Sequence, residues 1–151
     1  MRAWGPNKTS ARFDGSKVFS QNFMARHVIP TAKSGTFDDP VAAKQFAATL
    51  DGRCAVKADG LALGKGVLLT ESIADAEKAI DQIMTEKAFG DAGQNLVIQE
   101  LMEGMEVSLH AWVDGKSAKL FPTSQDHKRA LDDDKGLNTG GMGTYSPAPF
   151  L

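Results

Sequence analysis

The sequence has very little cysteine, no surplus of charge and no long apolar run. Its single cysteine, Cys54, excludes an internal disulfide framework and favours a reducing compartment such as the cytoplasm. The formal net charge of −2 argues against a general nucleic-acid or membrane-binding surface. No apolar run approaches the roughly 20 residues of a membrane-spanning helix. What is present, 42% hydrophobic and 24% charged residues in a chain of 151, suffices for a domain with its own core.

The segment 57–66 concentrates glycine and lysine directly after the short apolar run 54–56. Glycine permits positive φ and close backbone approach, and bare N–H groups together with ammonium groups bind anionic oxygens. This combination predicts a loop that holds a polyphosphate. The residues expected to make its contacts are Lys57, Gly60, Gly64, Lys65 and Gly66.

The loop matches neither of the two common phosphate-binding motifs. A Walker A loop has four residues between its first glycine and the Gly-Lys pair, whereas three residues separate Gly60 from Gly64 here. The Rossmann glycine spacing is absent as well. Both motifs open a helix, but the β-branched, apolar run 67–70 indicates a strand. We therefore expect a strand–loop–strand lid over a nucleotide; for the loop taken alone, the alternative is an ordinary hairpin with solvated lysines.

Capping residues and apolar periodicity predict helices and strands in the first two thirds of the chain. The predicted helices are 17–26, 40–50 and 73–83, with Ser16, Asp39 and Ser72 as N-caps. The last of these should turn Ile73, Ala76, Ile80 and Ile83 inward. Strands are expected at 54–57, 67–70 and 96–98.

The last third is predicted to combine a hairpin with a glycine-rich loop. Alternation of apolar and polar residues over 107–113 predicts a strand with one buried face. Asp114-Gly115 predicts a turn into a second strand at 118–121. The segment 138–143 is expected to be a loop built for close backbone approach.

Metal ligation is not favoured by any of the acidic or histidine residues. The run Asp132–Asp134 resembles a metal site at first sight, but consecutive acids rarely converge on one ion, so a solvated turn is preferred. No cluster with ligand spacing surrounds His27 or His110.

Several polar side chains beside the predicted strands suit a nucleotide. Lys57 would aim its ammonium at phosphates, the alternative being a lysine whose stem packs while its amine reaches water. Lys17 alone would be a surface lysine. The segment 99–102 could offer backbone groups to an adenine edge. Glu106, predicted on the same strand face as Ser108 and His110, could accept hydrogen bonds from ribose hydroxyls, although such a glutamate is more often a surface residue.

The segment Gln125–Arg129 gathers polar groups of every type. His127 could serve as a general base or as a neutral hydrogen-bonding group. Lys128 and Arg129 suit a phosphate or a carboxylate.

Taken together, these segments resemble the phosphoribosylamine–glycine ligase (glycinamide ribonucleotide synthetase) family of the ATP-grasp superfamily. The matches run in order through nearly the whole chain, and those at 57–66 and 138–149 are the most specific. They are GSK at 15–17, IPTA at 29–32, KADGLALGKG at 57–66, QDHKR at 125–129 and NTGGMGTYSPAP at 138–149.

The resemblance implies an α+β fold, namely part of an ATP-grasp domain. Residues 1–52 would form a linker and helical segment, 53–121 the small lid subdomain, and 122–151 the start of the large subdomain. It also implies ATP-dependent ligation of glycine to 5-phosphoribosylamine through a glycyl phosphate, a step of purine synthesis. ATP and magnesium would be the cofactors, the partners would be small molecules and the missing parts of the same enzyme, and neither nucleic acid nor membrane is expected.

The resemblance also assigns roles to residues of this chain. The nucleotide-binding residues would be Lys17, Lys57, Gly60, Gly64, Lys65, Gly66, Gln99, Glu100, Leu101, Met102, Glu106, Asn138, Gly140 and Gly141. The catalytic residues would be Lys57, Lys65, Asp126, His127, Lys128 and Arg129. The segments 126–129 and 138–143 would contribute to the substrate side.

Three departures from the family pattern matter. Gln99 stands where the family usually has a glutamate, and Leu137 where it usually has a proline. The family's magnesium-binding glutamate and asparagine would lie beyond Leu151, and its N-terminal substrate domain before Gly5. The chain is therefore expected to be a central fragment that alone binds ATP weakly at best and makes no product. The alternatives are a non-catalytic nucleotide-binding fragment and another ATP-grasp ligase, such as a biotin-carboxylase-like enzyme.

Overall fold

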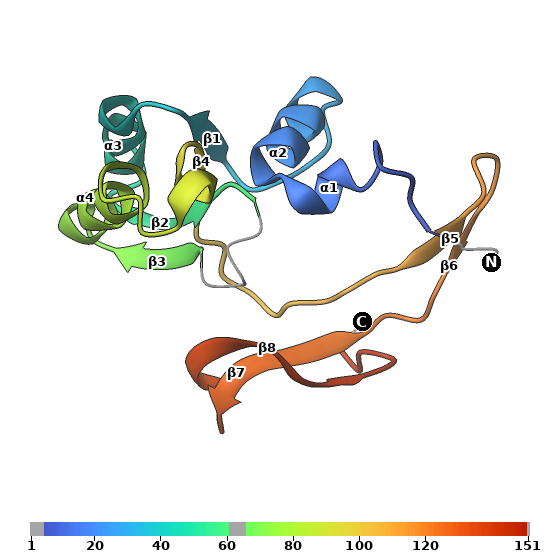
Figure 1. Ribbon diagram of the computed structural model, residues 1–151. Coiled ribbons are helices and arrows are strands. Elements are labelled where there is room, and N and C mark those ends of the chain that lie inside the picture. The colour runs from blue at the N-terminus through green and yellow to red at the C-terminus, as the bar shows by residue number, and fades with distance from the viewer. Residues whose placement is uncertain (1–4, 61–65, 151) are drawn as a thin grey trace. The chain divides into compact units, whose positions relative to one another are not determined.

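Antiparallel sheets organise both halves of the chain (Figure 1). The computed structural model describes residues 5–60 and 66–150, apart from the side chains of residues 137 and 138. The chain divides into two compact units, Met1–Met102 and Glu103–Leu151.

The first unit is built on a four-stranded sheet with the order β1-β4-β2-β3, in which every neighbouring pair is antiparallel. The three strands predicted from the sequence are confirmed. The strands are β1 (Ser34–Phe37), β2 (Arg53–Ala58), β3 (Val67–Glu71) and β4 (Leu96–Glu100).

All three predicted N-caps are present. The Ser16 hydroxyl accepts a hydrogen bond from the Phe19 N–H at the start of α2, and Ser72 accepts one from Asp75 at the start of α4. Asp39 accepts from two N–H groups of α3, whose first residue is a proline. The helices are α1 (Arg12–Gly15), α2 (Lys17–Arg26), α3 (Pro40–Ala48) and α4 (Ile73–Ile80), followed by a π-helical turn, η1 (Asp81–Thr85), and a 3₁₀ turn, η2 (Gly90–Gly93).

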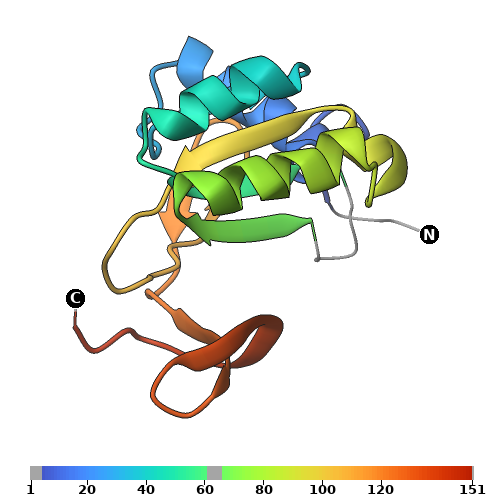
Figure 2. The ribbon, with the colours of Figure 1, turned by 90° about the vertical axis from the view of Figure 1, so that its left-hand side faces the viewer.

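The core of this unit lies between one face of the sheet and helices α3 and α4, which lie side by side over the strands (Figure 2). Alternate residues of the strands reach it, including Val56 and Ile98, which are fully buried. Ala76, Ile80 and Ile83 point inward as predicted. The prediction that Ile73 points inward is wrong, since its side chain is 45% exposed. At the first turn of α4 the backbone, and not the Ile73 side chain, lies against the Gly52 turn.

The second face of the sheet is only partly covered. Helix α2 lies against β1 and β4 there. The Ser34 hydroxyl donates to Gln21 Oε1 at 2.9 Å, and the Thr36 hydroxyl to Asn22 Oδ1 at 3.4 Å. On the β2–β3 side of this face, Val67 and Leu69 remain exposed.

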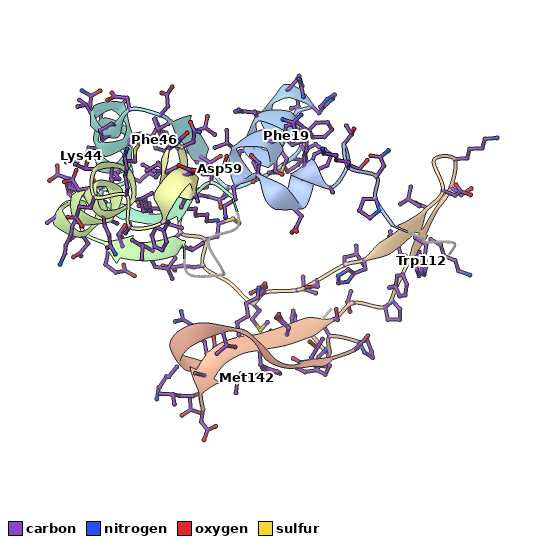
Figure 3. All side chains as sticks on the ribbon, in the orientation of Figure 1. Phe19, Lys44, Phe46, Asp59, Trp112 and Met142 are labelled. Atoms are coloured by element: carbon purple, nitrogen blue, oxygen red, sulfur yellow. The ribbon has the colours of Figure 1, made fainter. Side chains whose placement is uncertain are left out.

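The second unit consists of two antiparallel hairpins. The first pairs β5 (Ala111–Val113) with β6 (Ala118–Leu120), and the predicted turn is confirmed, with Gly115 at φ +89°. The buried face predicted for 107–113 is wrong, since Leu109 is 60% exposed and Val113 is 65% exposed. Alternation shows that a strand has two unlike faces, but whether anything covers the apolar one depends on the surrounding fold. Trp112 projects from this hairpin (Figure 3), and its ring lies tilted against that of Phe121, with the ring centroids 5.6 Å apart.

The second hairpin pairs β7 (Gln125–Leu131) with β8 (Lys135–Tyr145). The prediction that 138–143 is an irregular loop is wrong, because this segment lies within β8. Two register shifts opposite His127–Leu131, and Gly141 at φ +122°, let the glycine-rich run pair as an irregular strand. The solvated turn expected at Asp132–Asp134 is confirmed, with Asp133 and Asp134 in the left-handed region.

Candidate functional site

Lys57 lies near the end of β2, on the face of the sheet opposite the core. Its neighbours in register are Val67 of β3 and Val97 of β4. The ammonium donates a hydrogen bond to Gln99 Oε1 at 2.5 Å. Burial lowers the pKa of Lys57, and the nearby charge of Lys17 lowers it further. The ammonium is thus half-buried against a neutral amide instead of a carboxylate.

Lys17 is brought to the same place from the first turn of α2. Its Nζ donates to the carbonyl oxygen of Gly60 at 3.0 Å, across 43 positions of sequence. Two lysines remote in sequence are therefore brought to the region where β2 leads into the glycine-rich loop, and the charge of Lys17 acts on the pKa of Lys57. Like charges held close repel, and an anion with several oxygens relieves that repulsion.

Asp59 fixes this arrangement, and sequence reasoning missed it. Its Oδ1 accepts from the Val18 N–H at 3.2 Å and its Oδ2 from the Ser16 hydroxyl at 3.1 Å. The side chain lies between β2 and α2 (Figure 3). One signal was available: the first turn of α2 has no acidic residue of its own, although such a position favours negative charge.

Backbone contacts hold the two ends of the glycine-rich loop together. Gly60 adopts φ +87°, and the Ala58 N–H donates to the Gly66 carbonyl at 2.8 Å, which brings the two ends of the loop together. The predicted contacts of Gly64 and Lys65 lie outside the described residues.

An apolar strip lies beside Lys57 on the same face. Val67 stands opposite Lys57 and Leu69 opposite Ala55, and the two apolar side chains are 40% and 50% exposed. Such a strip next to paired cations suits a ligand with a flat apolar ring and an anionic tail.

The segment predicted to line an adenine site follows the same sheet. Gln99 and Glu100 end β4, and Leu101 and Met102 continue without regular structure. The Glu100 carboxylate accepts from the Lys33 N–H at 2.6 Å, while the Glu100 N–H donates to the Lys33 carbonyl at 2.9 Å. Both the side chain and the backbone of Glu100 therefore anchor the end of β4 to Lys33.

The second unit brings the two predicted substrate-side segments onto neighbouring strands. In the β7–β8 hairpin, Asp126 pairs with Thr144 and His127 with Gly143. The Arg129 backbone pairs with Asn138, and its guanidinium donates to the Gly136 carbonyl at 2.8 Å. The Oδ1 atom of Asp126 is buried and has no hydrogen-bond partner among the described residues, and its Oδ2 faces Gly141. Gly140 is open on its Cα side.

Glu106 is ion-paired instead of lying in a regular strand. The prediction that it shares a strand face with Ser108 and His110 is wrong, because 106 and 110 lie outside strands and Ser108 forms only an isolated bridge to Ser124. The Lys128 ammonium donates to Glu106 Oε1. This contact, with the charges of Glu106 and Asp126, raises the pKa of Lys128.

The described residues contain neither a cluster of metal ligands nor a membrane-spanning helix. Within them, no three His, Cys, Asp or Glu side chains lie close enough together to hold a metal ion. Nor is any helix among them both long and apolar enough to cross a membrane.

Comparison with known proteins gives a consistent result. The family described as "Phosphoribosylglycinamide synthetase, ATP-grasp (A) domain" matches residues 15–151. The chain is 46% identical over 151 residues to a phosphoribosylamine–glycine ligase of Streptococcus pyogenes, and covers 36% of that protein. It is 47% identical over the same length to a bifunctional purine biosynthetic protein of Dictyostelium discoideum, and covers 18% of it. The chain thus spans about a third or less of the relatives it matches.

Solved structures agree with the fold. A phosphoribosylamine–glycine ligase from Thermotoga maritima superposes with a TM-score of 0.86 at 35% identity, over 95% of this chain and 37% of that one. A D-alanyl-alanine synthetase A from Vibrio cholerae superposes with a TM-score of 0.58 at 18% identity, over 81% of this chain and 35% of that one. The second likeness concerns the fold alone.

Proposed function

This chain belongs to the phosphoribosylglycinamide synthetase ATP-grasp (A) domain family, and from that premise we propose that it supplies the nucleotide-binding part of a cytoplasmic phosphoribosylamine–glycine ligase. The substrates of the whole enzyme would be ATP, glycine and 5-phosphoribosylamine. The single observation that carries the proposal is the hydrogen bond from the Lys17 ammonium to the Gly60 carbonyl, which brings a lysine of α2 to the base of the glycine-rich loop three residues after Lys57.

The proposed reaction has two steps. The glycine carboxylate attacks the γ-phosphorus of ATP, and the bond from that phosphorus to the oxygen bridging the β- and γ-phosphates breaks. The products of this step are glycyl phosphate and ADP. The amine of 5-phosphoribosylamine then attacks the carbonyl carbon, loses a proton as the C–N bond forms, and expels inorganic phosphate. The protein's contribution to both steps is to position the reactants and to neutralise transferred negative charge.

The residues described above would divide this work. Lys17 and Lys57 would hold phosphate oxygens beside Gly60 and Gly66, the two ends of the glycine-rich loop. Val67 and Leu69 would contact the adenine ring, whose polar edge would meet the backbone of 101–102. Glu106 would accept from the ribose. The paired segments 126–129 and 138–143 would serve the substrate side, and magnesium would accompany the nucleotide.

The nucleotide part of the proposal is tested on the chain itself. Isothermal titration with ATP should show binding that K57M weakens by at least about tenfold, since one charge-assisted contact contributes about 1.5–3 kcal/mol. K44M is the matched control, because Lys44 lies in the same unit and pairs with Asp81 at 2.8 Å, away from the loop. Equal weakening by both substitutions would contradict the proposed site.

The ligase part requires the full-length protein that contains this sequence. ADP release should depend on glycine and 5-phosphoribosylamine together, followed in a coupled assay. Bicarbonate with biotin should give none. ADP release with bicarbonate and biotin, and none with glycine, would assign the chain to a different ATP-grasp reaction.

A further inference from the structure

We propose that Asp59 is a positioning residue that holds Lys17 beside Lys57, so that the two ammonium groups present a preformed pair of cations to a polyphosphate. The inference deepens the proposed function and rests on it for the identity of the ligand. Asp59 itself would touch no phosphate; it would act through α2 and Lys17.

The contacts of Asp59 bracket Lys17 on both sides. One carboxylate oxygen accepts a hydrogen bond from the hydroxyl of Ser16, and the other accepts one from the N–H of Val18. The residue between them, Lys17, donates a hydrogen bond from its ammonium to the carbonyl of Gly60, the residue after Asp59. Three hydrogen bonds therefore tie the first turn of α2 to two consecutive residues at the base of the loop.

The Asp59 carboxylate also supplies the negative charge that the first turn of α2 lacks. The hydroxyl of Ser16 is used twice, because it accepts from the Phe19 N–H while it donates to Asp59. The Val18 N–H is one of the unpaired donors of a helix N-terminus, and Asp59 satisfies it with a full negative charge. No acid within the first turn of α2 could do this in its place.

The arrangement sets two positive charges against each other in the absence of a ligand. Lys17 lowers the pKa of Lys57, and among the described residues the hydrogen-bond acceptor of Lys57 is the neutral Gln99. Without Asp59, the first turn of α2 would be free to move and the repulsion would drive Lys17 away. The affinity of the pair for a polyphosphate would then fall.

The test measures the pKa of Lys57 without a ligand, by NMR titration of its side-chain signals, in the wild type and in D59A. D59A should raise this pKa toward the ordinary value of a lysine, about 10.4. The substitution also removes a negative charge, whose direct effect would lower the pKa of Lys57. K17M separates the two effects: in a K17M background, D59A should no longer raise the pKa at all.

The matched control is D39A, which removes an aspartate that caps α3 through two N–H groups remote from the lysines. It should destabilise the protein about as much as D59A and leave the pKa of Lys57 unchanged. D59N keeps one acceptor oxygen and should give a smaller rise than D59A. If D59A does not fold, D59N in the wild-type and K17M backgrounds completes the same cycle.

Binding of inorganic tripolyphosphate and of ATP gives the second readout. D59A should weaken both about tenfold, and D39A neither. An unchanged or lowered pKa of Lys57 in folded D59A, or a rise that persists in K17M, would overturn the positioning role. If the expected pKa changes occur but the wild-type full-length protein binds neither ligand, the positioning of the lysines stands and the proposed function fails.

Discussion

Lys57 is a charged group held where its charge is unfavourable. Burial and Lys17 both lower its pKa, so the folded protein binds this proton less readily than the unfolded chain does. Stability therefore rises with pH between the lowered folded pKa and the unfolded value of about 10.4. Below that window the charged ammonium lowers the free energy of unfolding. Such a cost is typical of a charged group whose function is to bind an anion.

Replacing Lys57 by methionine should stabilise the ligand-free protein while weakening its binding of ATP. K57M keeps the length of the side chain and removes the desolvated charge, so the melting temperature at pH 7 should rise by about 2–4 °C, the effect of about 1 kcal/mol in a chain of this size. Urea denaturation at a series of pH values should show the advantage of K57M shrinking toward pH 10. A lower melting temperature for K57M at pH 7 would show that the Gln99 contact outweighs the charge.

Gln99 determines how much of that charge is compensated. In Q99E, the acceptor of the Lys57 hydrogen bond becomes a carboxylate, which favours the charged form of the lysine. The pKa of Lys57 should rise, and stability at pH 7 should rise with it, by less than about 1 kcal/mol because the site is partly solvated. NMR titration of Lys57 measures the shift; Q94E, at an exposed glutamine of the same unit, is the control and should leave it unchanged.

At the scale of elements, one close backbone contact fixes how α3, β2 and α4 meet. Gly52, at φ +73° in the turn between α3 and β2, lies so near the start of α4 that an added Cβ would overlap the backbone of Ser72 and Ile73. The Thr70 hydroxyl also donates to the Gly52 carbonyl at 2.6 Å. Neither backbone segment can yield without moving its helix.

G52A should therefore be among the most destabilising small substitutions in the first unit. We expect a loss of more than about 3 kcal/mol, from left-handed strain of about 1–2 kcal/mol together with the overlap. G90A is the matched control, since Gly90 also has a positive φ, of 57°, but no atom within 4 Å of an added Cβ. Chemical denaturation of the two variants measures the difference, and equal losses would show that the contact at Gly52 adds nothing to the strain.

The elements also show what sequence can predict. The three N-caps were predictable because a cap joins residues two or three positions apart, and each was confirmed. The pairing of 138–143 with β7 was not predictable from the sequence. A high glycine content indicates only a permissive backbone, whereas the strand with which a segment pairs depends on the tertiary structure. Asp59 was missed for the same reason: its contacts span more than 40 positions, and no local pattern distinguishes it from a turn aspartate.

At the scale of the whole molecule, buried apolar surface is unevenly shared. Every fully buried large side chain in the described part of the chain belongs to the first unit, and most of them lie in the core between the sheet and the helices. In the described part of the second unit, Ala148 is the one buried residue. Hydrophobic burial is the main favourable term in folding, and two hairpins without a shared core are marginally stable in water.

The two units should therefore differ in their capacity to fold alone. A fragment ending at Met102 should give a dispersed amide NMR spectrum and a cooperative melt within a few degrees of that of the whole chain, because the core and the Asp59 contacts all lie within it. A fragment covering 103–151 should be largely unfolded. Since Lys17, Asp59 and Lys57 all belong to the first fragment, D59A should raise the pKa of Lys57 there as in the whole chain. A first fragment that is unfolded would show that the second unit contributes stability that its exposed hairpins do not suggest.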